Sequence, residues 1–310
     1  MVFGITAINV LIMMAYAVPG YILVKAKLVK TEAISAFSIL LLYVSQPFLT
    51  IYSFQKASFS MAMLGNMGIV LGLSTLIQAG FLLIMYLIYR KHYDNPGYRV
   101  STVAIAFGNV GFLGVPLLEA MIPQYPEAVA YSAVFIISMN FLAWTLGSAF
   151  LTGDKKHMKP KNFLLNPLML GLIVALPLFF TGTKLTGTVM NSVEILGKMT
   201  APLCMLILGM RFATVKPKEL FSDGRIYITS SMKLIIYPLA VFLLVFALPV
   251  ETSIKLTLFI LSCCPTASMV QNLAEIHGVG GQKEAANSVL LSTIFSMVTI
   301  PLLSLMLVLL

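Results

Sequence analysis

Charged residues are scarce in this sequence, and their scarcity excludes an ordinary water-soluble fold. Of 310 residues, 20 are Lys or Arg and 11 are Asp or Glu, whereas 59% are hydrophobic. Soluble domains are about 45–50% apolar, and the mean hydropathy here is +0.96. The composition therefore predicts an all-α protein embedded in a membrane.

Residues that build metal and catalytic centres are scarce as well. The three cysteines, Cys204, Cys263 and Cys264, all lie in apolar segments, which argues against a disulfide scaffold and against zinc-ligand spacing. The sequence has no nucleotide-binding loop, no His-rich metal motif and no paired carboxylates within one helix. We expect no cofactor and no enzymatic activity. A membrane-embedded enzyme or sensor is the third choice, and the loops are too short for a sensing domain.

Uncharged segments long enough to cross a bilayer recur along the chain. A transmembrane helix needs roughly 20 mainly apolar residues, and these segments do not alternate as the strands of a β-barrel do. The first segment lacks a preceding basic region, so it is interpreted as a helix and not as a signal peptide. The ten expected helices cover residues 1–24, 34–55, 57–89, 100–118, 128–153, 162–183, 190–211, 234–250, 256–274 and 285–310.

The net charge of +9 is divided unequally between alternate loops. Fifteen basic residues fall on one side, whereas only Lys56, Lys184, Lys198 and Lys255 fall on the other. An excess of Lys and Arg marks cytoplasmic loops, so both termini are predicted to be non-cytoplasmic. Because the charge reports topology, nucleic acid is not an expected partner.

Features of the first half recur about half a chain later. Gln46-Pro47 matches Ala201-Pro202, and Glu119 precedes Glu275 by a similar offset. Five helices in each half require the second half to insert upside down. We therefore predict two inverted five-helix repeats, residues 1–155 and 156–310, an architecture typical of transporters.

Two of the apolar segments contain helix-breaking residues at corresponding places. The first is Asn109-Val-Gly-Phe-Leu-Gly-Val-Pro116, and the second is Cys263-Cys-Pro-Thr-Ala-Ser268. A broken membrane helix exposes N–H groups that favour an anion and carbonyl groups that favour a cation. Such paired breaks predict a substrate site, although Gly-rich spacing also serves simple helix packing. The candidate substrate-binding residues are Gln46, Asn109, Gly111, Gly114, Pro116, Pro265, Thr266, Ser268, Gln271 and Asn272.

Asn109-x-Gly-Phe-x-Gly-x-Pro116 resembles the first crossover motif of the auxin efflux carrier family, which includes plant auxin exporters and bacterial permeases for malate or malonate. Cys264-Pro-Thr-Ala-Ser268 resembles its counterpart, except that Ser268 stands where many members have Asn. The resemblance implies ten helices in which broken helices 4 and 9 cross at the substrate. It also implies a scaffold of helices 1, 2, 6 and 7 and a core of helices 3–5 and 8–10.

Few ionisable residues lie near the breaks. Glu119 and Glu275 are candidates for ion coupling, because burial favours their protonated forms, and solvated helix-end carboxylates are the alternative. Lys233 either balances substrate charge or extends its amine to the membrane surface. Four further residues have structural interpretations: Glu194 pairs with Lys198, Arg211 anchors the topology, and Trp144 belongs to an interfacial belt or packs against lipid.

The leading hypothesis is a secondary transporter of small organic anions in a bacterial inner (plasma) membrane. A mono- or dicarboxylate such as malate or malonate would bind at the crossed helices and move by alternating access. H⁺ or Na⁺ is the candidate coupling ion, and a homodimer is one option for its assembly. The alternative is a sodium-coupled carrier or a channel for a different small solute, because fold analogy does not determine substrate.

Overall fold

The computed structural model describes residues 2–158, 161, 167–215, 217–221 and 223–310. Within these residues every named element is a helix, as predicted, and the extended backbone forms one isolated β-bridge. Lys159 and Lys216 of the charge pattern, and residues 162–166 of the expected sixth helix, lie outside the described residues.

Short helices follow one another closely along much of the chain. Those of the first half are α1 (Val2–Ala15), α2 (Ala17–Lys25), α3 (Ala33–Leu40), α4 (Gln46–Gln55), α5 (Met61–Tyr89), α6 (Pro96–Ala106), α7 (Val115–Met121), α8 (Glu127–Leu142) and α9 (Ser148–Thr152). Those of the second half are α11 (Pro167–Phe180), α12 (Gly187–Lys198), α13 (Thr200–Thr214), α14 (Pro217–Leu220), α15 (Gly224–Ser231), α16 (Tyr237–Ala247), α17 (Thr252–Ser262), α18 (Ser268–His277) and α19 (Gln282–Ser304).

Turns of wider or tighter helix connect several of these elements. The π-helical turns are η1 (Leu41–Ser45), η3 (Val110–Gly114), η4 (Ala143–Gly147) and η6 (Met232–Ile236), and the 3₁₀ turns are η2 (Arg90–His92), η5 (Lys155–His157) and η7 (Leu305–Leu309). Side chains fix several helix starts: Ser60 caps α5, Asn95 caps α6 and Asp223 caps α15.

Seven helices in the described part of the chain are long and apolar enough to cross a membrane. They are Ala7–Lys25, Ala33–Gln55, Met61–His92, Glu127–Thr152, Gly187–Thr214, Gly224–Ala247 and Gln282–Leu309. Each overlaps one of the ten predicted segments, although Gly224–Ala247 begins ten residues before the predicted 234–250. The predicted segments 4 and 9 overlap the shorter apolar helices Val110–Met121 and Thr252–Ser262, and segment 6 contains Met169–Phe180. Segments 4 and 9 are short because both are broken, as their sequences predicted.

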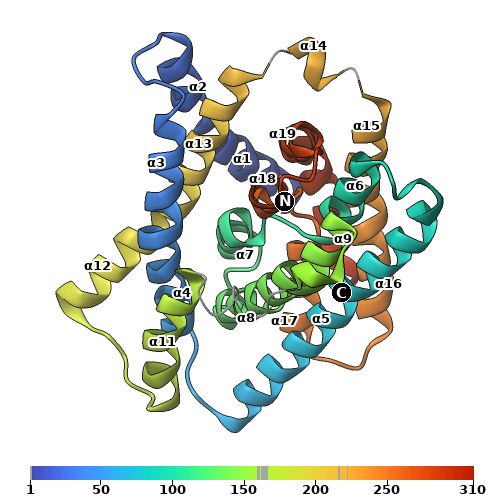
Figure 1. Ribbon diagram of the computed structural model, residues 1–310. Coiled ribbons are helices and arrows are strands. Elements are labelled where there is room, and N and C mark those ends of the chain that lie inside the picture. Colours follow the sequence, from blue (N-terminus) through green and yellow to red (C-terminus); the bar gives the residue numbers. More distant parts are fainter. Residues whose placement is uncertain (1, 159–160, 162–166, 216, 222) are drawn as a thin grey trace.

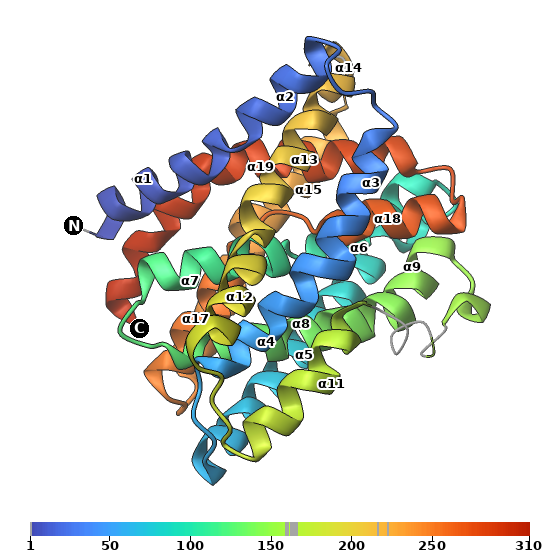
Figure 2. The ribbon, with the colours of Figure 1, turned by 90° about the vertical axis from the view of Figure 1, so that its left-hand side faces the viewer.

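The helices form two groups with a pair of helices between them. Figure 1 shows α2–α4 and α11–α13 on one side, and α5, α6, α8, α9 and α15–α17 on the other. Helices α7 and α18 lie between these groups, and Figure 2 shows α1 running along α19. Within the first group, a Cβ on Gly20 would overlap the carbonyl oxygen of Leu206, so glycine permits the close contact of α2 with α13.

Candidate functional site

Two extended segments cross where the broken helices are interrupted. Gly108 pairs with Thr266 in an antiparallel bridge, in which the Asn109 N–H donates to the Pro265 carbonyl at 2.6 Å. The Ala267 N–H donates to the Phe107 carbonyl at 3.0 Å. Backbone groups without a helical partner are costly inside a membrane protein, and this pairing satisfies them mutually. We call residues 107–109 and 265–267 the crossing.

Side chains strengthen the crossing. The buried Thr266 hydroxyl donates to the Ala104 carbonyl at 3.1 Å, and the Thr266 N–H donates to the Ser292 hydroxyl at 3.1 Å. Thr266 of the second half therefore hydrogen-bonds a carbonyl group near the end of α6 and is itself bonded to Ser292 of α19. Thr266 and Pro265 build the crossing, and neither lines the cavity beside it.

The interruption of the helix in the first half is shorter than the sequence predicted and lies nearer to the N-terminus. Gly111 and Gly114 lie in the π turn η3, and Pro116 lies in the first turn of α7. The π turn directly before it accommodates the proline, because the backbone hydrogen bonds there depart from the α-helical pattern that the missing N–H would complete. The prediction of a break over residues 109–116 is thus corrected to residues 107–109.

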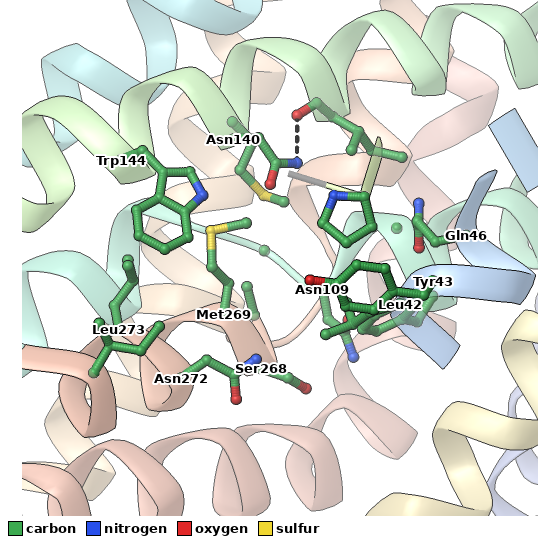
Figure 3. A pocket seen from close by; sticks show the side chains of 18 residues that line it. Leu42, Tyr43, Gln46, Asn109, Asn140, Trp144, Ser268, Met269, Asn272 and Leu273 are labelled. Carbon is green, nitrogen blue, oxygen red and sulfur yellow. Dashed lines mark hydrogen bonds between the residues drawn. The ribbon is translucent and has the colours of Figure 1, made fainter. Parts of the chain in front are cut away.

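A cavity of about 390 Å³ lies against the crossing, a size that suits a small molecule. Its residues come from the α3–α4 segment, the two half-helices after the crossing, α8 with η4, and the start of α11. They are Leu42, Tyr43, Gln46, Gly108, Asn109, Gly111, Phe112, Ile136, Met139, Asn140, Trp144, Pro167, Ala267, Ser268, Met269, Asn272, Leu273 and Ile276. Figure 3 shows Asn109 and Gln46 on one side of this space and Trp144 on the other.

The cavity carries polar groups but no charged side chain among its described lining residues. The Trp144 indole nitrogen and Gln46 Oε1 are buried and have no hydrogen-bond partner among the described residues. Buried polar atoms of native proteins are nearly always paired. An indole N–H is a donor only, so this atom is suited to an acceptor oxygen on a ligand.

Helix ends supply the electrostatic bias that side chains lack. The half-helix that starts with η3 faces the cavity with Asn109, Gly111 and Phe112, and α18 faces it with Ser268, Met269 and Asn272. The N-terminal end of a helix carries roughly half a positive charge on its free N–H groups. Two such ends border the same space, so the cavity favours an anion.

The structure brings half of the predicted site residues to this cavity. Those that line it are Gln46, Asn109, Gly111, Ser268 and Asn272. Gly114 faces another helix, since a Cβ there would lie 2.7 Å from Leu261 Cδ2, and Pro116 lies beyond it in α7. Gln271 donates to Glu275 at 2.8 Å and does not line the cavity.

Trp144 and Asn140 were not among the predicted site residues. Trp144 lines the cavity with its indole nitrogen buried, and the Asn140 amide donates to the Ile136 carbonyl at 2.9 Å beside it. No sequence motif marks them. The π turns do mark the site: η1, η3 and η4 each contribute lining residues, in keeping with the frequent occurrence of π turns at functional sites.

The ionisable candidates lie outside the cavity. Glu119 accepts a 2.6 Å hydrogen bond from the hydroxyl group of the fully buried Tyr52, and this bond joins α7 to α4. Glu275 is exposed. The Glu194–Lys198 pair is confirmed at 2.7 Å. Arg211 lines a small adjoining cavity of about 30 Å³ that shares Ser268 and Asn272 with the larger one.

A family model described as membrane transport protein matches residues 4–304. The chain belongs to this membrane transport protein family. The match covers nearly the whole chain and confirms the resemblance to auxin efflux carriers that the Asn109–Pro116 motif indicated. A comparison with curated proteins found no match. As a member of a transporter family, the protein is a multi-pass membrane protein that moves a solute across a lipid bilayer.

Proposed function

We propose that this membrane transport protein is a secondary carrier of small organic anions, with a carboxylate bound in the cavity beside the crossing. The observation that carries the proposal is the convergence of two half-helix N-terminal ends on a space of about 390 Å³ whose described lining residues include no charged side chain. Helix ends and amides can hold a carboxylate at the cavity wall itself, and charged side chains act on it only from outside that lining.

The substrate we infer is a mono- or dicarboxylate of the size of malate or malonate. One carboxylate meets Asn109 and the start of α18, and the unpartnered Trp144 N–H donates to a substrate oxygen from the other side of the cavity. Arg211, in the adjoining small cavity, is the charged partner for a second carboxylate. This arrangement favours dicarboxylates over monocarboxylates.

Alternating access is the mechanism we infer, with α1–α4 and α11–α13 as the scaffold and α5–α9 with α15–α19 as the moving core. The antiparallel pairing of residues 107–109 with 265–267 supports two inverted repeats, 1–155 and 156–310, in a ten-helix protein. The charge asymmetry supports both termini outside the cytoplasm of a bacterial inner membrane. A homodimer stays a prediction.

The test is uptake of labelled malate, malonate and acetate into proteoliposomes, with Asn109→Ala beside Asn191→Ala, which changes an exposed residue outside the cavity. We expect Asn109→Ala to lower uptake at least tenfold and Asn191→Ala to leave it unchanged. Equal uptake by both variants would refute the site. Uptake by wild type of none of these acids would refute the substrate class, and strict Na⁺ dependence would favour the sodium-coupled alternative.

A further inference from the structure

Lys233 is a buried lysine that does not line the proposed transport site. It lies in the π turn η6, between α15 and α16, and its side chain is 0% exposed. Its Nζ atom has no hydrogen-bond partner among the described residues. An amine that reached the membrane surface would be solvated, so the surface-reaching interpretation of Lys233 is wrong. A buried cation without a partner is costly and is therefore retained for a reason.

The amine of Lys233 lies against the crossing. A Cβ atom on Gly108 would be 3.2 Å from Lys233 Nζ and 3.5 Å from the Cys264 carbonyl oxygen. The amine also lies 4.0 Å from the centroid of the Tyr237 ring, a cation–π distance. Gly108 lines the substrate cavity, whereas Lys233 does not. The amine is therefore separated from the cavity by a residue that has no side chain.

The backbone around the amine favours a positive charge. Helix α6 ends at Ala106, two residues before Gly108, and α17 ends at Ser262, two residues before Cys264. The C-terminal end of a helix carries roughly half a negative charge. Two such ends, one from each half of the chain, meet at the crossing, and this is the arrangement in which broken helices of transporters coordinate a cation.

We propose that Lys233 is a cation built into the crossing: its ammonium occupies the site between the ends of α6 and α17 and opposes the charge of the anion in the cavity. This inference rests on the proposed function and deepens it. With the positive charge supplied by a side chain, transport needs no bound Na⁺. The short distance and the low local dielectric let the charge act on an anion across Gly108.

The test compares wild type with Lys233→Met, which keeps the volume without the charge, and Lys233→Ala, which opens space at the site. Lys91→Met, at an exposed lysine, is the matched control. Malonate uptake is measured in Na⁺ and in choline, each with and without added ethylammonium. Melting temperatures of the purified proteins are measured with the same cations and no organic acid.

We expect equal wild-type uptake in Na⁺ and choline, and at least tenfold lower uptake by Lys233→Met in every medium. Lys233→Ala should be slow in choline and regain uptake with ethylammonium or Na⁺. Either cation should also raise its melting temperature, because a ligand that binds only the folded state stabilises it. Wild type and Lys233→Met should show no such shift.

Wild-type uptake by Lys233→Met would overturn the inference, and so would a Lys233→Ala protein that neither cation restores or stabilises. Lys233→Met keeps the side-chain volume, so uptake lost at an unchanged melting temperature assigns the loss to the charge and not to packing. Uptake lost only in proportion to a lost fold would assign Lys233 to stability alone and overturn the inference. If wild type carries none of the acids, the proposed function fails, and the melting shifts with ethylammonium still decide whether the cation site exists.

Discussion

Tyr52→Phe tests whether the Tyr52–Glu119 hydrogen bond closes one end of the cavity. Tyr52 follows Gln46 by six residues and Glu119 follows Gly111 by eight, so the bond lies about 9–12 Å along the helices from the cavity. Lys56, which follows α4, belongs to the loops with few basic residues, so we predict that this end faces the non-cytoplasmic side. The bond joins α4 of one helix group to α7 between the groups.

The expected magnitude follows from the chemistry of the bond. A hydrogen bond to a charged group contributes about 1.5–3 kcal/mol, and about 1.4 kcal/mol corresponds to a tenfold change in an equilibrium. Loss of the Tyr52 hydroxyl should therefore raise the population that is open to the non-cytoplasmic side about tenfold or more. Glu119→Gln, which keeps a neutral acceptor, should have a smaller effect in the same direction.

Accessibility of a cysteine at Asn272 measures this change. Asn272 lines the cavity, and the three native cysteines are buried, so labelling by a membrane-impermeant thiol reagent has a low background. Tyr52→Phe should speed labelling from the non-cytoplasmic side and slow it from the other. Tyr16→Phe, at a residue that is 42% exposed, is the control. Equal rates in both backgrounds would refute the closure.

Three further substitutions test separate parts of the site. Trp144→Phe keeps an aromatic ring but removes the unpartnered N–H, so the affinity for malonate should fall about 3–10-fold. The affinity is measured as the midpoint of malonate-dependent thermal stabilisation. Unchanged affinity would show that Trp144 does not bind the substrate. Arg211→Gln should reduce uptake of malonate more than uptake of acetate, and an equal loss for both would contradict a role at the second carboxylate. Thr266→Val should lower the free energy of unfolding by about 1–3 kcal/mol, because it leaves the Ala104 carbonyl unpaired. Thermal unfolding measures the change, with the milder Thr293→Ser as the control. An unchanged melting temperature would show that the bond to α6 is dispensable.

Local chemistry in the sequence was enough to predict much of the fold. Seven long apolar helices lie where uncharged segments of about 20 residues predicted them, because the length needed to cross a bilayer is set by its thickness. The two interruptions were visible because Gly and Pro change the backbone locally. Asn109 was visible because an amide inside an apolar segment requires a partner.

The faces of the helices were not predictable in this way. In a segment that is apolar all round, no hydrophobic periodicity tells which side chains face a cavity. Trp144 therefore read as an interfacial residue, whereas η4 turns it toward Asn109, and Gln271 read as a ligand, whereas it bonds Glu275.

The sequence alone thus determined that this is a multi-span membrane protein with two interrupted helices, since both properties depend on composition and on local backbone preference. Only the tertiary structure decided what meets at the interruptions. Gly108 lies opposite Thr266 in a bridge between segments more than 150 residues apart, and Lys233 reaches the same point from a third helix. Contacts between such distant residues depend on how the helices pack, and no local pattern encodes them.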